Sequence, residues 1–291
     1  MGVSMAVKLL IDSTNYLSPE DIERFGMRQV SLYINDGDKH DRELDLDYSD
    51  FYTRLADTTE IPTSAQPSHG AIIKEMSEII SEGDEVLGLT ISSEMSGTYD
   101  SFCMAAEQIK EKNPDAVIEI VDTWSNCLQE GFAVLSAAEV AAAGGTMQEC
   151  IDAAEATIAR TRFVFAPHTL EYLERGGRIG TAAALLGSVL KLVPILSVED
   201  GSVVTLSKVR TYPKALASLS EHLHKDIDAA GGLKRIAVHT IADSEHAQAF
   251  ADTYIEPLVG HPLDIVPIGP VIGAHVGPAV GVVYETNDPL R

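Results

Sequence analysis

Residues 86–121 read VLGLTISSEMSGTYDSFCMAAEQIKEKNPDAVIEIV, and this stretch decides the fold. The apolar run 86–91 predicts a buried strand, Ser96 opens a helix that extends to about Lys112, and residues 117–121 predict another strand. A strand, a helix and a second strand in this order are typical of a βαβ unit. We therefore expect these two strands to run parallel in one sheet.

The same alternation continues on both sides of this stretch. Toward the N-terminus, residues 7–11 predict a strand, Ser18 caps a helix that ends at Gly26, and Ser68 caps a helix that stops near Gly83. Toward the C-terminus, a helix at 127–143 is followed by a capping box at 146–149. The sequence therefore predicts a first α/β domain, residues 1–160, with a largely parallel sheet.

The pattern restarts near Arg160 and predicts a second α/β domain, residues 161–291, with a mixed sheet. A strand at 162–166 is followed by two short helical segments on either side of Gly176 and Gly177, and Gly201 lies in the turn of a hairpin. The remaining predicted elements are a helix at 213–228, strands at 236–239 and 263–268 around a helix at 243–258, and a last strand at 280–284.

Composition excludes several classes of function. The chain has 291 residues, and 44 Asp and Glu against 21 Lys and Arg give a formal charge of −23, which repels nucleic acid and anionic lipid surfaces. The apolar stretch 181–190 is too short to span a bilayer, which needs about 20 residues. Because residues 1–8 lack the pattern of a signal peptide, we expect a soluble, cytoplasmic protein.

The three cysteines, Cys103, Cys127 and Cys150, match neither a metal knuckle nor a disulfide framework, so we expect buried thiols and no metal. The Walker and Rossmann glycine spacings are absent as well. The sequence therefore predicts no nucleotide, metal or other cofactor.

Five polar segments carry the candidate chemistry: residues 12–14, 63–68, 92–99, 170–180 and 273–278. Several follow a predicted strand or open a predicted helix, where open α/β sheets bind ligands. Ser96 and Gly97 offer a hydroxyl, backbone N–H groups and a helix N-terminus, which together suit an anion, although Ser96 also fits a simple helix cap.

Each of the other candidate residues also has an ordinary structural interpretation. Ser64 fits a loop serine before a proline turn, and His275 fits a structural hydrogen-bonding group in a glycine-rich turn between strands. Arg175 and Arg178 fit solvated cations near a helix C-terminus. The order and spacing of the five segments favour a functional interpretation more than any one segment does.

Together, the five segments resemble the DegV family, the bacterial fatty-acid-binding proteins also called FakB. The similarity runs nearly end to end: the opening strand and its D-S-T at 7–14, S-A-Q-P-S at 64–68, S-S-E-M-S-G-T-Y at 92–99, L-E-Y-L-E-R-G-G-R-I-G at 170–180 and H-V-G-P at 275–278. The chain departs from the family at Ser64, which takes a threonine position, and at Ala65, which takes a serine position. It departs again at Ala279, where a glycine usually follows.

The resemblance implies two α/β domains with a lipid tunnel between them, lined in part by apolar segments such as 182–190. A long-chain fatty acid occupies the tunnel, and its carboxylate is held by Thr63 or Ser64, Ser96, the Gly97 amide and His275, with Arg178 and Arg210 as nearby cations. Burying about fifteen methylenes at ~0.8 kcal/mol each offers on the order of 10 kcal/mol.

The resemblance also implies a partner and a role. The chain is then not an enzyme but the lipid-binding subunit that presents the carboxylate to a separate fatty acid kinase, which makes an acyl phosphate for phospholipid synthesis. Arg175 and Arg178 are the candidates for docking that kinase or facing its phosphate, because cations are scarce in this chain and a guanidinium suits both carboxylate and phosphate.

Two alternatives remain open from the residues. A lipid carrier or sensor without a kinase partner would keep the binding site. A serine hydrolase would use Ser96 as nucleophile, His275 as base and Asp12 as the orienting carboxylate, but the sequence has no G-x-S-x-G elbow.

Overall fold

A computed structural model describes residues 5–58, 60–187 and 192–290, and it divides the chain into two compact α/β units. Unit 1 comprises residues 1–33, 42–44 and 65–158, and unit 2 comprises residues 34–41, 45–64 and 159–291. Each unit is described below by itself. Both are α/β, as the sequence predicted. None of the described helices is long and apolar enough to cross a membrane.

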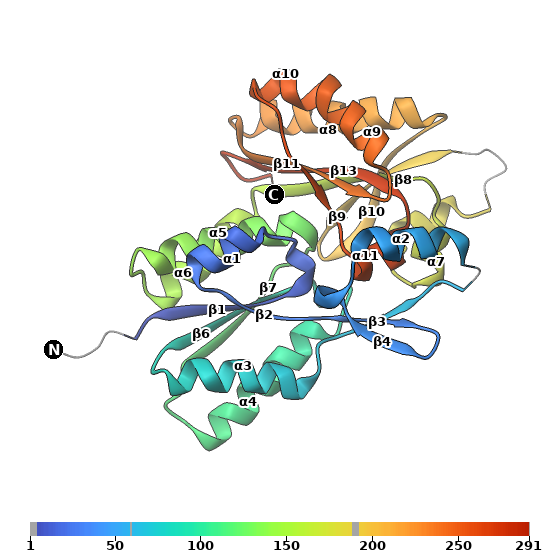
Figure 1. Cartoon of the computed structure of the whole chain (residues 1–291). Coiled ribbons are helices and arrows are strands. Elements are labelled where there is room, and N and C mark those ends of the chain that lie inside the picture. Colours follow the sequence, from blue (N-terminus) through green and yellow to red (C-terminus); the bar gives the residue numbers. More distant parts are fainter. Residues whose placement is uncertain (1–4, 59, 188–191, 291) are drawn as a thin grey trace. The chain divides into compact units, whose positions relative to one another are not determined.

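Unit 1 is built on a four-stranded parallel sheet with the order β2-β1-β6-β7. Helices α3 and α4 cover one face, and α1, α5 and α6 lie on the other (Figure 1). The bounds are β1 (Val7–Asp12), α1 (Pro19–Phe25), β2 (Arg28–Val30), α3 (His69–Ser81), β6 (Glu85–Thr90), α4 (Thr98–Lys112), β7 (Ile118–Asp122), α5 (Cys127–Ala142) and α6 (Met147–Ile158), with a 3₁₀ turn η1 (Ser13–Asn15) after β1.

Local sequence explains where these helices begin and end. Ser18 and Ser68 accept hydrogen bonds from the backbone N–H of Asp21 and Ala71, so both predicted N-caps are confirmed. Gly26 ends α1 with a φ of +60°, a conformation that glycine adopts without steric cost. Under the sheet, Leu10 of β1, Ile72 and Met76 of α3 and Phe102 of α4 belong to one buried apolar cluster.

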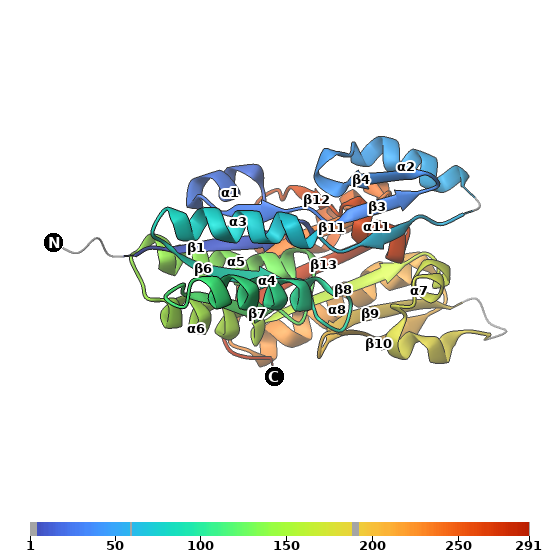
Figure 2. The same ribbon diagram turned by 90° about the horizontal axis from the view of Figure 1, so that it is seen from below.

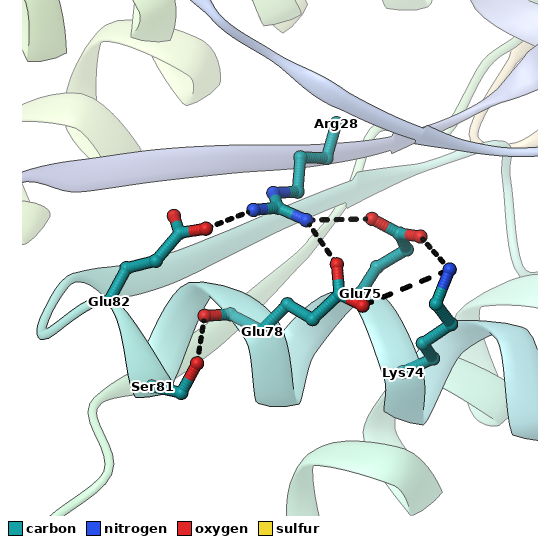
Figure 3. Close-up of polar contacts among 6 residues, drawn as sticks. All are labelled: Arg28, Lys74, Glu75, Glu78, Ser81 and Glu82. Carbon is teal, nitrogen blue, oxygen red and sulfur yellow. Dashed lines mark hydrogen bonds and ion pairs between the residues drawn. The ribbon is translucent and has the colours of Figure 1, made fainter.

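An ionic network fastens β2 to α3 at the edge of this sheet (Figure 3). The guanidinium of Arg28 lies 3.2 Å from Glu75, 2.7 Å from Glu78 and 2.5 Å from Glu82; the first two lie on α3, and Glu82 is its C-cap residue. Lys74 adds weaker contacts to Glu75 and Glu78. Because three carboxylates share one guanidinium, Arg28 offsets their mutual repulsion as well as joining the two elements.

Unit 2 contains a six-stranded mixed sheet with the order β10-β9-β8-β13-β11-β12. Strand β13 is antiparallel to both β8 and β11, and the predicted hairpin is β9 and β10. Most of a second sheet, β4-β3-β5, also falls in this unit. Helices α8, α9 and α10 lie on one side of the six-stranded sheet (Figure 1), and Figure 2 shows α8 beside β8 and β9 from below.

The elements of unit 2 have the following bounds. They are β3 (Tyr33–Asp36), β4 (Lys39–Arg42), the 3₁₀ turn η2 (Glu43–Asp45), α2 (Tyr48–Asp57), β5 (Thr63–Ala65), β8 (Thr161–Pro167), α7 (Glu171–Arg175), the 3₁₀ segment η3 (Gly180–Leu185), β9 (Val193–Glu199), β10 (Ser202–Val209), α8 (Tyr212–Ala229), β11 (Leu233–Ile241), α9 (Ser244–Phe250), the π-helical turn η4 (Ala251–Ile255), α10 (Glu256–Val259), β12 (Ile265–Pro267), α11 (Pro270–Val276) and β13 (Ala279–Thr286). Within these elements, residues 33, 42–44 and 65 belong to unit 1.

A buried polar group lies in the core of unit 2. The Tyr284 hydroxyl donates to Asp226 Oδ2 over 2.6 Å, and the Arg162 guanidinium lies 2.6 Å from the same oxygen. Tyr284 is fully buried on β13, while Asp226 lies on α8. The buried carboxylate is therefore paired and hydrogen-bonded, as a charge in an apolar core has to be.

Several structural details differ from the sequence expectations. The hairpin β3–β4 and helix α2 were not predicted, because segments such as 39–42 are polar and lack an apolar alternation. The predicted helix 243–258 is interrupted by the π-helical turn η4. Cys103 is partly exposed, whereas Cys127 and Cys150 are buried as expected, and all three are free thiols.

Two sequence predictions are only partly addressed by the described residues. The contact division falls at residues 158 and 159, but it also assigns residues 34–41 and 45–64 to unit 2, which the predicted domains 1–160 and 161–291 do not. Of the apolar segment 182–190, residues 188–190 lie outside the described residues.

Candidate functional site

The candidate site in unit 2 is centred on Ser64 and His275. Ser64 lies on the short strand β5, and its Oγ lies 2.7 Å from His275 Nε2. Its neighbour Thr63 is exposed and accepts a longer contact, 3.4 Å, from the Asn35 side-chain amide. The structure therefore brings Ser64, not Thr63, to the histidine, although which of the two hydroxyls meets a carboxylate stays a prediction.

His275 lies in the last turn of helix α11 and not, as the sequence suggested, in a glycine-rich turn between strands. Pro270 starts this helix, a position where its missing N–H costs nothing. The glycines that suggested a turn serve close packing instead. A Cβ at Gly273 would overlap the Tyr52 ring, and one at Gly277, which has a φ of +69°, would overlap the Tyr172 ring.

A polar pocket of about 460 Å³ opens beside this pair. Arg175 and Arg178 both line this pocket. Arg175 lies 2.7 Å from Glu171, and Arg178 donates to the Gly176 carbonyl over 2.7 Å. The full lining is Glu60, Ile61, Pro62, Thr63, Ser64, Arg175, Gly176, Arg178, Ala274 and His275.

Arg210 is exposed just after β10 and is not among the described residues that line the pocket. Its predicted role as a cation near the carboxylate stays a prediction. Gly176 was not singled out in the sequence, yet a Cβ there would overlap the His275 ring. The only sequence signal for this contact is that the Gly-Gly pair and His275 both occur in the five polar segments.

His275 is neutral at ordinary pH. Burial of the ring, with a smaller contribution from the positive charge of Arg178, lowers the pKa of His275 from 6.5 to about 4. Its Nδ1 atom is buried and has no hydrogen-bond partner among the described residues. A neutral imidazole bonded to a hydroxyl can orient that hydroxyl toward a ligand without introducing a buried charge.

Helix α11 also lines a second, apolar pocket in unit 2. This slot has a volume of only about 10 Å³, and Ile272 and Val276 line it from α11. The other lining residues are Phe163, Phe165, His239, Ile241, Ile268, Ala279, Val280 and Gly281. One helix therefore presents a histidine to a polar pocket and branched apolar side chains to an apolar slot.

Ser96 and Gly97 belong to unit 1, at the start of helix α4. Gly97 is the N-cap residue, and Ser96 Oγ accepts from the Thr98 amide over 3.3 Å and lies 2.9 Å from Thr98 Oγ1. Strands β1 and β6 are neighbours that lead to opposite sides of the sheet, so the loop after β6 lies at the switch point of this fold. A Cβ at Gly97 would overlap only the end of the Gln66 side chain, which is exposed and can move aside.

The D-S-T segment after β1 has a structural role. Asp12 Oδ1 accepts from the Thr14 amide and hydroxyl, and Asp12 Oδ2 accepts from the Ile91 amide, each over 2.7 Å. Asp12 therefore joins the ends of β1 and β6. Both of its oxygens are engaged inside unit 1, which removes the argument for Asp12 as the orienting carboxylate of a hydrolase triad.

Glu130 is a buried group that the sequence analysis did not single out. It lies 3.1 Å from the Thr14 hydroxyl, and burial, followed by the negative charge of Asp12, raises the pKa of Glu130 well above its usual range. The Thr14 hydroxyl lies between two acceptors, Glu130 Oε2 and Asp12 Oδ1. The available signal was that Glu130 is the one charged residue in the largely apolar run 127–138.

The fold and the site define this protein as a two-unit α/β protein with one parallel and one mixed sheet. It carries a serine–histidine pair beside a polar pocket. Within that class, the sequence profile of the DegV family matches residues 6–287. A DegV domain-containing protein of Clostridium acetobutylicum is 42% identical over 288 residues, which cover 99% of this chain and 100% of that protein. The chain belongs to the DegV family.

Solved structures agree with this assignment. A stearic acid-binding protein from Eubacterium ventriosum has a TM-score of 0.87 at 26% identity, covering 96% of this chain and 98% of that one. DegV from Bacillus subtilis, described as a fatty acid binding protein, has a TM-score of 0.85 at 29% identity, covering 97% of this chain and 99% of that one.

Proposed function

We propose that this protein binds a long-chain fatty acid and holds its carboxylate at Ser64 and His275. The observation that carries the proposal is the double role of α11, which lines a polar pocket with His275 and an apolar slot with Ile272 and Val276. A molecule with a charged head and an apolar tail is the ligand that such a pair of surfaces suits. The fatty-acid-binding relatives support the same substrate class.

The head-group chemistry follows from the serine–histidine pair. When the neutral His275 carries its proton on Nε2, that N–H donates to Ser64 Oγ over 2.7 Å. The Ser64 hydroxyl proton is then free to donate to a carboxylate in the pocket. A hydrogen bond to a charged group contributes about 1.5–3 kcal/mol, so this contact selects the head without dominating the affinity. Ser96 and Gly97 of unit 1 remain predicted donors.

The tail supplies most of the affinity in this proposal. Each buried methylene contributes about 0.8 kcal/mol. The slot of about 10 Å³ holds roughly one water, so an acyl chain that enters it displaces side chains such as the Phe163 and Phe165 rings. These two rings are stacked, with centroids 5.0 Å apart.

Fatty-acid binding to delipidated protein tests the proposal. His275→Ala and Ser64→Ala each remove one member of the pair, and we expect each to weaken binding about tenfold or more, because a donor to a buried charge is lost. His261→Ala is the matched control, since His261 is exposed and lies outside both pockets. Binding by both variants as tight as that of the parent would overturn the head-group assignment.

We further propose that a separate ATP-dependent kinase phosphorylates the bound carboxylate and that Arg175 and Arg178 face this partner or its phosphate. Both side chains are exposed at the mouth of the polar pocket, in a chain with a formal charge of −23. A guanidinium binds carboxylate or phosphate through two parallel hydrogen bonds. The two arginines therefore place positive charge beside the group that would react.

The test mixes loaded protein with the fatty acid kinase of its organism and ATP, and traps acyl phosphate as its hydroxamate. The Arg175→Glu/Arg178→Glu variant is compared with Lys214→Glu/Lys225→Glu, which makes the same charge change on the exposed side of α8. We expect the arginine variant to lose product formation more than fatty-acid binding. Equal product from both variants would remove the docking assignment. No product with any candidate kinase would favour a carrier or sensor.

A further inference from the structure

We propose that His168, Asp243 and His246 of unit 2 form a site for a divalent first-row transition-metal ion, with zinc as the ion to test. One ligand atom from each of the three residues lies within 4.8 Å of the others. Two imidazoles and one carboxylate are a donor set that zinc accepts, with water as a fourth ligand. This proposal is independent of fatty-acid binding.

The sheet of unit 2 brings the three residues together. His168 follows β8 directly, and Asp243 comes two residues after the end of β11. Because both strands run antiparallel to β13, they run in the same direction, and their carboxyl ends lie at the same edge of the sheet. His246 comes from the first turn of α9, a helix that packs against β11.

The side chains already converge on one carboxylate. His168 Nε2 lies 2.6 Å from Asp243 Oδ2, and His246 Nδ1 lies 2.8 Å from Asp243 Oδ1. Asp243 occupies the N-cap position of α9, yet its side chain makes no capping hydrogen bond. The preceding Ala242 has a φ of +50°, a left-handed conformation that is unfavourable for alanine. The Asp243 carboxylate therefore faces the two histidines and not the helix N-terminus, and the chain before it adopts a strained conformation at Ala242.

The Tyr212 ring packs against the imidazole rings of both His168 and His246. The Tyr212 ring lies 4.1 Å from the His168 ring and 4.8 Å from the His246 ring, measured between centroids. Its hydroxyl donates to the Ala166 carbonyl over 3.0 Å, which fixes the ring against β8. The Asp243 side chain is only 10% exposed, whereas the two histidine side chains are 38% and 41% exposed. The site is therefore buried on the side of Asp243 and Tyr212 and open to solvent on the side of the two histidines.

Metal binding would need only small changes in protonation. In the described arrangement, His168 Nε2–H and His246 Nδ1–H donate to Asp243. With a metal bound, those nitrogens supply lone pairs, and each neutral ring keeps its proton on its other nitrogen. The prediction of no metal rested only on the cysteine spacing and missed this cluster, because 75 residues separate His168 from Asp243.

Zinc binding to the full delipidated chain, measured by calorimetry and by competition with a chromophoric chelator, tests this proposal. We expect one equivalent to bind, and Co²⁺ at the same site to give the visible absorption of a tetrahedral ion. His168→Ala, His246→Ala and Asp243→Asn should each weaken binding at least about tenfold, since each removes one of three protein ligands. His69→Ala and His261→Ala remove exposed histidines outside the cluster and serve as controls.

The zinc affinities of these variants distinguish a metal site from a purely hydrogen-bonded cluster. Weakened binding in the three variants with unchanged binding in the two controls supports the site. Equal affinity in all five variants, or no stoichiometric binding by the parent, overturns it and leaves the cluster as a hydrogen-bonded His–Asp–His group. If Asp243→Asn melts at a lower temperature, the histidine variants, whose rings are on the surface, decide the question.

Discussion

Replacing Gly176 with alanine is a direct perturbation of the serine–histidine pair. Gly176 has a φ of −74° and a ψ of −11°, which alanine adopts without strain. The added Cβ would overlap His275 Nδ1 and lie 3.3 Å from Cε1 of the same ring. The imidazole must therefore move, and Ser64 loses its oriented partner without any change in either residue.

The expected magnitudes follow from these contacts. Overpacking a close contact costs about 1–3 kcal/mol, and part of that cost is relieved when the ring shifts and gives up one hydrogen bond worth about 1 kcal/mol. We expect Gly176→Ala to lower the free energy of unfolding by about 1–2 kcal/mol. A lost donor to a charged head costs about 1.5–3 kcal/mol, so fatty-acid affinity should fall between about tenfold and about 150-fold.

The assay pairs fatty-acid titration of delipidated protein with the imidazole ¹⁵N resonances of His275. Gly70→Ala is the control, because nothing lies within 4 Å of a Cβ at that helical glycine. A Gly176→Ala protein with unchanged affinity and an altered His275 resonance would show that the imidazole position does not matter for the head group. Unchanged affinity and an unchanged resonance would refute the predicted overlap itself.

Three further predictions concern stability. Arg28→Gln should lower the free energy of unfolding by about 1 kcal/mol in urea titrations at low salt, and by less in 1 M salt, because three carboxylates lose their shared cation. Tyr284→Phe should cost about 1.5–3 kcal/mol, because the buried carboxylate of Asp226 loses a donor; a change below 0.5 kcal/mol, roughly the level of a neutral surface substitution, would contradict this. Burial lowers the pKa of both His239 and His275 from 6.5 to about 4, so the folded state binds fewer protons than the unfolded state in this window. Stability should therefore fall as the pH drops from 6.5 to 4, by at most about 3 kcal/mol per histidine, and His239→Asn should flatten that fall.

Much of the fold could be predicted because local signals agree with the tertiary structure. Ser18, Ser68 and the capping box at Thr146 each mark a helix start that the structure contains. The parallel sheet of unit 1 follows from apolar runs alternating with helical patterns. The fold class was therefore accessible from capping chemistry and hydrophobic periodicity alone.

The local conformation around His275 could not be predicted in the same way. Gly273 and Gly277 suggested a flexible turn, but their small size instead lets Tyr52 and Tyr172 pack closely against a short helix. The approach of Gly176 to the His275 ring is likewise a contact between distant segments. Such packing depends on partners far away in the chain, which a pattern within one segment does not encode.

Native mass spectrometry of the purified protein tests the central claim most directly. The account predicts a population heavier than the chain by one fatty acid of roughly sixteen to eighteen carbons, lost on delipidation and regained when the acid is added back. His275→Ala should retain less of this ligand than His261→Ala does. A protein that carries no ligand and takes up no added fatty acid would contradict the account.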